Sequence, residues 1–141
     1  MGKAGRVVRV SRLLLLIIGI AGCAATANDE YVPTAHERVL YQAPIAGIGV
    51  EGKEVKITHF LVSAGYVGDK HMHPGPTFVY VLKGELTVKH ADETKTLKMG
   101  EVYAMEAGQV VTGMNLAPSD ELEILVFQIE GVGEPAMIIV E

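Results

Sequence analysis

Two histidines at alternate positions, His71 and His73, have the type and spacing to carry chemistry in this sequence. Side chains of an extended chain alternate with a period of two, so both imidazoles point to the same side. They could then converge on one metal ion, each at about 2.0 to 2.1 Å. Two histidines that merely lie on the surface are the ordinary alternative, so the interpretation depends on their neighbours.

Asp69 is the first of these neighbours, because it has the same parity as both histidines in an extended chain. Its carboxylate would complete a face of two histidines and one carboxylate, a set typical of non-haem iron sites. The alternative is a turn residue beside Gly68. Glu106 and Gln109 are further candidates to reach inward, and solvated loop positions are the alternative for both.

Three further residues near the pair are candidates for ligand contact. His59 shares a strand face with Val55, Ile57 and Leu61, and we expect it to look into the interior, either as a ligand contact or as a core histidine bonded to the backbone. The thioethers of Met72 and Met114 would suit Cu(I), a soft ion. Alternation predicts, however, that both methionines point away from the histidine face.

Short β-branched and aromatic runs separated by Gly, Pro, Asp and Asn must position these residues, and no helical periodicity occurs. Several short strands at roughly ten-residue spacing favour an all-β antiparallel sandwich or barrel. Gly84 and Gly100 are expected in hairpin turns that need a positive φ. We expect strands near residues 38–42, 55–62, 77–83, 86–90, 94–97, 102–105, 110–114, 122–129 and 136–140.

The histidine segment resembles the first motif of the cupin superfamily, Gly-x5-His-x-His-x3,4-Glu-x6-Gly, with Gly65, His71, His73 and Gly84 in register. The second cupin motif, Gly-x5-Pro-x-Gly-x2-His-x3-Asn, is similar to residues 100–115, where its two glycines and its asparagine are kept and Glu106 replaces the proline. The resemblance implies a small single-domain cupin with an antiparallel double-stranded β-helix, or jelly roll. It covers about half of the domain expected at residues 28–141.

Two departures from the motifs bear on function. The resemblance implies a metal held by three histidines and a glutamate, but Thr77 stands at the glutamate position and Val111 at the third histidine. Valine has no donor atom, and a threonine hydroxyl is a poor ligand for Zn²⁺, Fe²⁺ or Mn²⁺. We therefore expect a degenerate metal site, at which a divalent ion (Fe, Mn, Zn or Cu) would bind weakly.

Residues 1–27 have the parts of an export signal: a basic start, an apolar run over residues 13–21 and small residues after it. The apolar run is too short to span a bilayer. The residues Ile20-Ala21-Gly22-Cys23 resemble the bacterial lipobox, which implies lipidation of Cys23, and Ala24 after it suggests sorting to the outer membrane. Ordinary cleavage after Ala27, which would release a soluble periplasmic protein, is the alternative.

Charge excludes one class of partner. Four of the twelve basic residues precede the apolar run, so eight remain in the exported domain against 17 acidic residues, a formal net charge of −9. A nucleic-acid binder needs a basic face to contact phosphates. We therefore expect no nucleic-acid partner, and contact with a membrane only through the lipid anchor.

The strand at residues 77–83 is apolar on both faces, so both faces need a cover. One face can line the barrel, and the stripe Phe78, Tyr80 and Leu82 on the other predicts a homodimer.

Three functions remain open from the sequence. The first is an exported cupin that binds a small organic ligand in its barrel, lined by His71, His73, Thr77, Val111 and His59. The second is a metal-dependent cupin dioxygenase or isomerase that uses His71, His73 and a surrogate carboxylate such as Asp69. The third is a purely structural envelope component. The sequence leaves open whether any reaction is catalysed.

Overall fold

Ten strands in two antiparallel sheets make up the computed structural model of this chain, which describes residues 30–47 and 49–141. The export signal and Cys23 lie outside the described residues. Within the described part no helix is long and apolar enough to cross a membrane. Residues Tyr31–Glu141 form one unit. The predicted all-β antiparallel class is confirmed.

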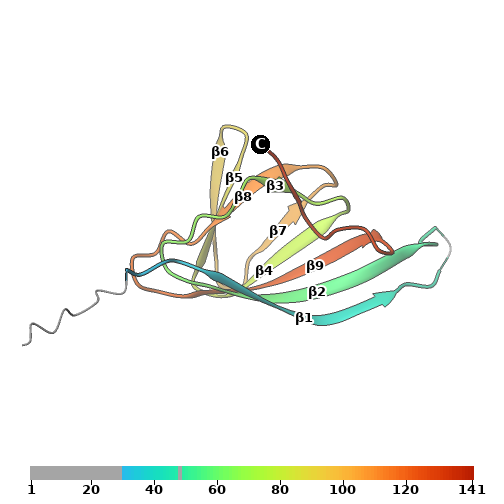
Figure 1. The fold of residues 1–141 in the computed structure, drawn as a ribbon, viewed down its shortest axis with the longest axis horizontal. Helices are drawn as coiled ribbons and strands as arrows, with labels where there is room; N and C mark the ends of the chain where they lie inside the picture. Colours follow the sequence, from blue (N-terminus) through green and yellow to red (C-terminus); the bar gives the residue numbers. More distant parts are fainter. Residues whose placement is uncertain (1–29, 48) are drawn as a thin grey trace, which may run out of the picture. The chain divides into compact units, whose positions relative to one another are not determined.

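The first sheet has the strand order β1-β2-β9-β4-β7 and forms one wall of the barrel (Figure 1). Its members are β1 (Ala35–Pro44), β2 (Lys53–Val62), β9 (Leu122–Gly131), β4 (Thr77–Lys83) and β7 (Val102–Met105).

The second sheet has the order β10-β3-β8-β5-β6 and faces the first. Its members are β10 (Ile138–Ile139), β3 (His71–Met72), β8 (Val110–Met114), β5 (Glu85–His90) and β6 (Glu93–Lys98). Consecutive strands often lie in different sheets, because the chain crosses from one wall to the other. This is the arrangement of a double-stranded β-helix.

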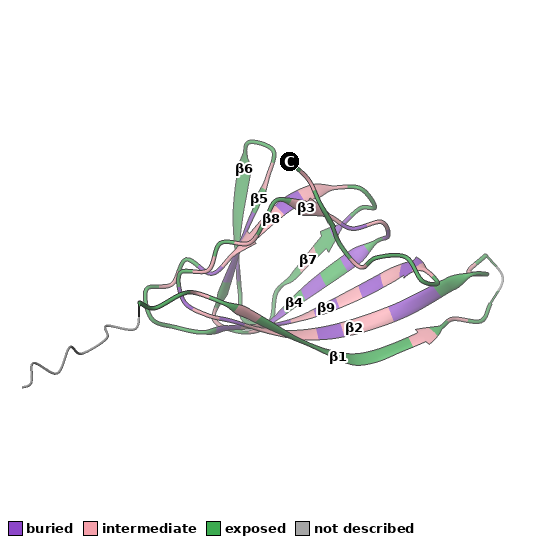
Figure 2. Cartoon of the chain, viewed as in Figure 1, coloured by how far each residue is buried: buried purple, intermediate pink, exposed green. Residues whose placement is uncertain are grey.

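The core lies between the two sheets and follows from the alternation of side chains along the strands. Along β9, residues alternate between buried and half-buried from Leu122 onwards, and along β4 the buried residues Thr77, Val79 and Val81 alternate with more exposed ones (Figure 2). The members of the core are Val62, Val79, Val81, Leu86, Val88, Leu97, Met105, Val111, Leu122, Ile124 and Val126.

All nine expected strands are present, and β3 is an additional one. The expected hairpins at Gly84 and Gly100 are wrong, although both glycines have the expected positive φ (79° and 89°). Gly84 joins β4 to β5 and Gly100 joins β6 to β7, and each pair of strands is divided between the two sheets. A Cβ at Gly84 would lie 2.9 Å from the carbonyl oxygen of Glu121, so this crossing has no room for a side chain.

Asn115 is a residue of the second cupin motif that this chain keeps, and its contacts show that it has a structural role. It is fully buried, and its Nδ2 lies 3.0, 3.1 and 2.8 Å from the carbonyl oxygens of Val62, Ser63 and Asp120. Its Oδ1 accepts a hydrogen bond from the backbone N–H of Ala117 at 3.1 Å. The side chain thus ties the loop after β8 to the end of β2, which is a structural role.

The outer stripe of β4 is uncovered in the described unit. Phe78 and Tyr80 are 40% and 41% exposed, and Phe78 packs edge-on against Phe127 of β9 at a ring-centroid distance of 6.2 Å. Val102, the residue opposite Tyr80 on β7, is also exposed. The second sheet covers only the lumen face of the first, and the described residues before β1 leave Phe78 and Tyr80 exposed.

Candidate functional site

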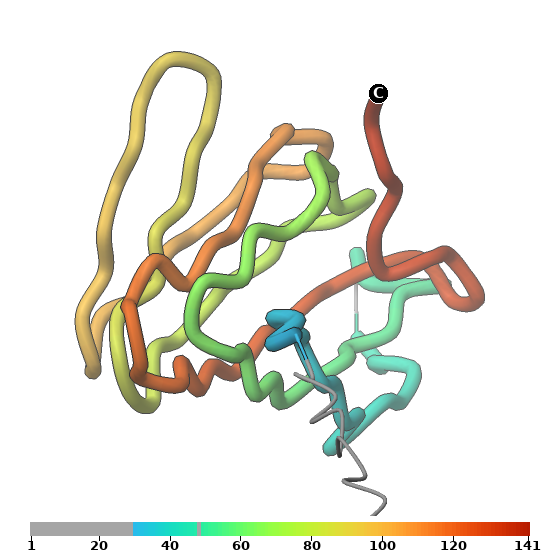
Figure 3. Tube along the Cα trace, turned by 60° about the vertical axis from the view of Figure 1, so that its left-hand side comes forward, coloured from blue at the N-terminus to red at the C-terminus, as the bar shows by residue number. Residues whose placement is uncertain are grey.

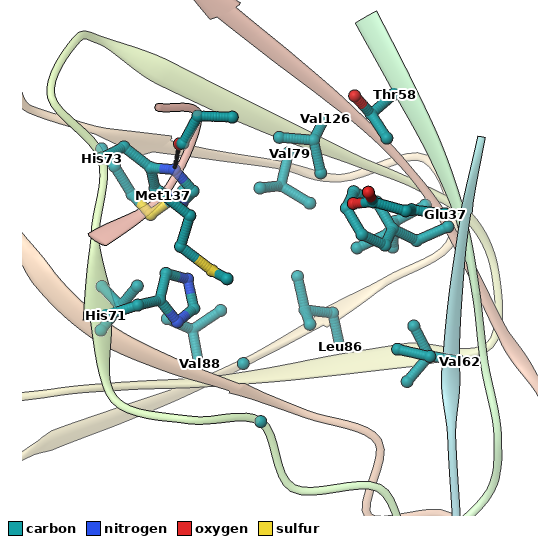
Figure 4. A pocket seen from close by; sticks show the side chains of 18 of the residues that line it. Glu37, Thr58, Val62, His71, His73, Val79, Leu86, Val88, Val126 and Met137 are labelled. Carbon is teal, nitrogen blue, oxygen red and sulfur yellow. Dashed lines mark hydrogen bonds between the residues drawn. The ribbon is translucent and has the colours of Figure 1, made fainter. Parts of the chain in front are cut away.

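A pocket of about 220 Å³ lies between the two sheets. Most of its wall is aliphatic, with side chains from both sheets that include Val79, Leu86, Val88, Val111, Ile124 and Val126. His71, His73 and Met137 lie at one end of the pocket and Glu37 and Val62 at the other (Figure 4). The pocket therefore has an apolar body and one end rich in imidazole.

His71 is positioned by the short strand β3, where it lies opposite Val111 of β8. Its Nδ1 donates a hydrogen bond of 2.7 Å to the backbone carbonyl of Asp69. This bond places a proton on Nδ1, so the lone pair of the neutral ring is on Nε2.

His73 is buried, and its Nδ1 lies 2.7 Å from the carbonyl oxygen of Ala136. The Nε2 of Gln128 lies 2.6 Å from the same oxygen and 2.9 Å from the His73 nitrogen. The carbonyl has two lone pairs, so it accepts one hydrogen bond from each nitrogen. His73 is thereby held in the same tautomer as His71, with its Nε2 free.

The pKa of His73 is lowered below its ordinary value because burial disfavours the charged imidazolium. The hydrogen bond to Ala136 opposes this shift, and the positive charge of a protonated His71 would add to it. His73 is therefore neutral at pH 7 and acts as a hydrogen-bond acceptor or a metal ligand through Nε2.

The two imidazoles lie close together, with ring centroids 5.0 Å apart and planes at 83°. No group of three or more His, Cys, Asp or Glu side chains is placed to hold a metal ion anywhere in residues 30–47 and 49–141. The Asp69 carboxylate therefore does not form such a group with the two histidines in this structure. Asp69 lines the pocket, but it engages His71 through its backbone carbonyl.

The two substituted motif positions differ in what they do. Val111 lines the pocket opposite His71, where the cupin motif has a third histidine. Thr77 is fully buried on the lumen side of β4, but it is not part of the pocket wall, and its hydroxyl donates to the carbonyl of Gly75 at 3.2 Å. The residues present do not fit a divalent ion held by three imidazoles and a carboxylate.

His59 does not look into the pocket, so that expectation is wrong. The residues of β2 that line the pocket are Lys56, Thr58, Phe60 and Val62, and His59 alternates to the opposite face. There its Nε2 lies 2.7 Å from Oε1 of Glu123, which lies diagonally across on β9, opposite Leu61. We expected His59 to face the interior because apolar residues share its strand face. Both faces of β2 carry apolar side chains, however, so this pattern does not identify the inner face.

Glu106 and Gln109 likewise do not reach the imidazoles. Glu106 is exposed, and its backbone N–H donates to Oε1 of Gln109. The Nε2 of Gln109 donates to the hydroxyl of Tyr103 at 3.2 Å. These two residues close the turn after β7.

Sequence reasoning missed the residues that complete the site: Gln128, Ala136 and the thioethers of Met105 and Met137. The alternation that begins at Leu122 could have placed Gln128 on the lumen face. Nothing local to Ala136 or Met137 could have shown that the tail folds back onto β3. Met114 also lines the pocket, contrary to expectation. The consecutive residues Gly113 and Met114 both border the pocket, so strict alternation does not hold at this end of β8.

A second buried polar group lies next along the inner face of β9. Glu130 is 1% exposed, and its Oε2 has no hydrogen-bond partner. Burial raises the pKa of this carboxyl above its usual range, Lys56 opposes the shift, and Glu54 and Glu134 add to it. Glu54 is the residue directly opposite Glu130 on β2 and is also buried.

Comparison with known proteins agrees with this architecture. The cupin domain family matches residues 58–127. No curated protein matches the sequence significantly. A cupin superfamily protein from Desulfitobacterium hafniense is similar in structure, with a TM-score of 0.56 and 17% identity over 67% of this chain and 76% of that one.

Two further solved structures are similar. A cupin-like protein from Thermotoga maritima has a TM-score of 0.56 and 21% identity over 77% of this chain and 78% of its own. A DMSP lyase from Ruegeria pomeroyi has a TM-score of 0.58 and 17% identity over 75% of this chain and 51% of its own. Identities at this level show a shared fold. The family match over residues 58–127 and the two-sheet barrel together show that this chain carries a cupin domain and has the cupin fold.

Proposed function

We propose that this protein is an exported single-domain cupin that binds a small organic ligand in its barrel, without need of a divalent metal. One observation carries the proposal: an aliphatic pocket of about 220 Å³ that ends at two imidazoles with free Nε2 atoms. A cavity of about 150 Å³ lined by aliphatic and aromatic side chains can hold benzene. A substituted ring or a short branched chain is therefore the right size.

The histidine end defines the chemistry of the ligand. In the neutral form of each ring the proton is on Nδ1, so Nε2 accepts a hydrogen bond and donates none. A ligand with an apolar body and a hydroxyl, enol or N–H group at one end would satisfy both parts of the pocket. Few well-placed polar groups in an apolar pocket are typical of small-molecule sites.

A metal-dependent dioxygenase or isomerase has less support. It would need a carboxylate beside His71 and His73, and the side chain of Asp69 does not form a metal-binding group with them. The ligand-binding proposal needs no such rearrangement.

Extraction of small molecules from the purified protein, together with elemental analysis, tests the proposal. Val111→Phe should fill part of the pocket and lower the amount of ligand recovered, while Val102→Phe on the exposed strand β7 should leave it unchanged. An organic molecule recovered in proportion to protein from wild type and lost from Val111→Phe would support the proposal. One tightly held divalent metal per chain that is lost in Asp69→Ala would overturn it and favour the enzyme.

We further propose that Cys23 is lipidated and that the protein is anchored to the periplasmic side of the outer membrane. Two or more acyl chains anchor a protein stably, which a single chain does not. Cys23→Ser should release the protein from the membrane fraction, and mass spectrometry should find acyl chains on wild type alone. A soluble wild-type protein whose chain begins at Asn28 would show ordinary cleavage instead.

We also propose a homodimer formed through the stripe of Phe78, Tyr80 and Leu82. Its support is the exposure of Phe78 and Tyr80 on a well-formed sheet, beside the half-buried Leu82. Tyr80→Glu should give monomers or aggregates, whereas Thr94→Glu on the exposed strand β6 should not. A wild-type protein that sediments as a monomer at micromolar concentration would contradict the proposal.

A further inference from the structure

The end of the pocket away from the histidines carries a carboxylate. Glu37 of β1 lines the pocket, and Figure 4 shows its side chain extending from β1 into the pocket, at the end that it shares with Val62. The flanking residues His36 and Arg38 alternate to the outer face of the sheet, where Arg38 lies opposite His59. One anionic side chain therefore faces the ligand at this end.

The carboxylate of Glu37 has no cationic partner within residues 30–47 and 49–141, where the one ion pair joins His59 to Glu123. Glu37 is exposed, so water can solvate its carboxylate when the pocket holds no ligand. The cost of removing that water is smaller than for a fully buried carboxylate, and a cationic group of the ligand would offset it. This end of the pocket is thus suited to a positive charge.

Aromatic side chains line the same end of the pocket. Phe60 lies directly opposite Glu37 in the pairing of β1 with β2, and both residues line the pocket. Directly opposite residues of an antiparallel pair have Cβ atoms about 4.5 to 5.5 Å apart. Tyr66 follows the end of β2 at Val62 and also lines the pocket. The face of an aromatic ring attracts a cation, and aromatic side chains recognise organic ammonium groups.

The cation of the pocket wall lies elsewhere. Lys56 is the one Lys or Arg that lines the pocket in the part of the chain that the structure describes. It lies opposite Gln128, which contacts the ring of His73. Burial raises the pKa of the nearby Glu130 carboxyl, and the charge of Lys56 opposes that shift. Lys56 thus lies near the histidine end and near a buried carboxyl, so the Glu37 end has no cation to bind an anionic ligand.

Net charge favours the same sign of ligand. The exported domain has eight basic residues against 17 acidic ones, a formal net charge of −9. The field of an acidic protein raises the local concentration of cations and speeds their association. The charge of the whole domain and the single carboxylate at the Glu37 end therefore act in the same direction.

We propose that the ligand of the barrel is a small organic cation whose ammonium group binds Glu37 beside the rings of Phe60 and Tyr66. This inference rests on the organic-ligand function proposed above and names the class of that ligand. The apolar body of the cation fills the aliphatic part of the pocket. A hydroxyl or N–H group at its other end donates to the Nε2 atoms of His71 and His73. An anionic ligand is rejected, because its charge would lie against the carboxylate of Glu37.

Calorimetric titration of the purified, dialysed protein with three matched probes tests the proposal. Tyramine carries a phenol hydroxyl, an aromatic body and an ammonium group. In 4-ethylphenol the ammonium group is absent, and in 3-(4-hydroxyphenyl)propionate a carboxylate takes its place. Tyramine should bind roughly tenfold more tightly than 4-ethylphenol, because an exposed ion pair and a cation–π contact each contribute modestly. The propionate should bind most weakly, and the preference for tyramine should shrink at high salt.

Variants of Glu37 assign the preference to its charge. Glu37→Gln keeps the size of the side chain and should remove the advantage of tyramine while leaving the affinity for 4-ethylphenol unchanged. Glu37→Lys should reverse the order and favour the propionate. Asp69→Asn, at the other carboxylate of the pocket wall, and Glu93→Gln, on the exposed strand β6, are the matched controls and should keep the wild-type order.

The outcomes separate this inference from the function on which it rests. Absence of tyramine binding, equal affinity for all three probes, or an equal loss of tyramine affinity in Asp69→Asn and Glu37→Gln would overturn the assignment. Recovery of an anionic molecule from the purified protein would also overturn it, but would keep the ligand-binding function. Val111→Phe should weaken the binding of tyramine and of 4-ethylphenol alike. Unchanged affinity in that variant would place both probes outside the barrel and contradict both proposals.

Discussion

Gln128 and Glu130 are consecutive inward residues of β9, and both are almost fully buried, yet their surroundings differ. Gln128 donates a hydrogen bond to the carbonyl of Ala136, which also accepts a hydrogen bond from Nδ1 of His73. Glu130 lies opposite another buried carboxylate, Glu54, and its Oε2 has no partner. A buried polar group with a partner can orient a site, whereas one without a partner costs stability.

The C-terminal tail separates these two surroundings. After β9 the tail turns back at residues 131–134, where the carboxylate of Glu134 accepts a hydrogen bond from the N–H of Gly131 at 2.8 Å. It then crosses to β3 and brings the carbonyl of Ala136 to Gln128 and His73, as the trace in Figure 3 allows the reader to follow. The tail therefore satisfies one of the two inward polar residues of β9 and leaves the other against carboxylates.

The largest expected effect comes from supplying the histidine end with the anion and imidazole that it lacks. Thr77→Glu with Val111→His should convert a chain that loses divalent ions on dialysis into one that keeps about one ion per chain. Elemental analysis after dialysis measures this. Val111→His alone is the control, because it adds an imidazole without an anion. Retention of a divalent ion by wild type would contradict the prediction.

Replacing the unpartnered carboxyl should have the next largest effect. The pKa of Glu130 is raised from 4.5, so the folded state keeps a proton that the unfolded state loses as the pH rises. Stability therefore falls as pH rises through the window above 4.5, and Glu130→Gln should remove this fall. We expect a gain of about 1 to 2 kcal/mol in the free energy of unfolding at pH 7 and little at pH 4.

Denaturant unfolding at both pH values measures the difference. Glu121→Gln is the matched control, because Glu121 is exposed and should respond little. A variant at position 130 that is less stable than wild type at pH 7 would mean that the attraction of Lys56 outweighs the cost of burying the carboxylate.

The smallest expected effect comes from weakening the partnered side. Gln128→Leu removes one of the two donors to the Ala136 carbonyl and should cost about 1 kcal/mol. It should leave the His73 hydrogen bond in place, so nitrogen NMR should still find the proton on Nδ1. Gln109→Leu removes a half-buried glutamine that bonds Tyr103 and is the control. A shift of the proton to Nε2 in Gln128→Leu alone would show that Gln128 itself selects the tautomer.

Much of the fold was predictable from local patterns. The β-branched runs and the turn residues predict nine of the ten strands, and the cupin motifs predict the jelly roll. The hairpins predicted at Gly84 and Gly100 were wrong. A glycine with positive φ indicates that the chain turns, but it does not determine which strand the following strand pairs with. That choice depends on the burial of both sheets together.

The candidate site was predictable only in part, and the sequence by itself determined its histidines. The spacing of His71 and His73, and the absence of a donor at Val111, follow from residue type and strand parity alone. Tertiary structure decided the partners: that the Asp69 carboxylate stays apart, that His59 lies on the outer face, and that Ala136 and Met137 lie beside His73. The physical reason is that strand alternation is a local property, whereas the contact between a tail and a strand more than 60 residues away depends on the closure of the whole barrel.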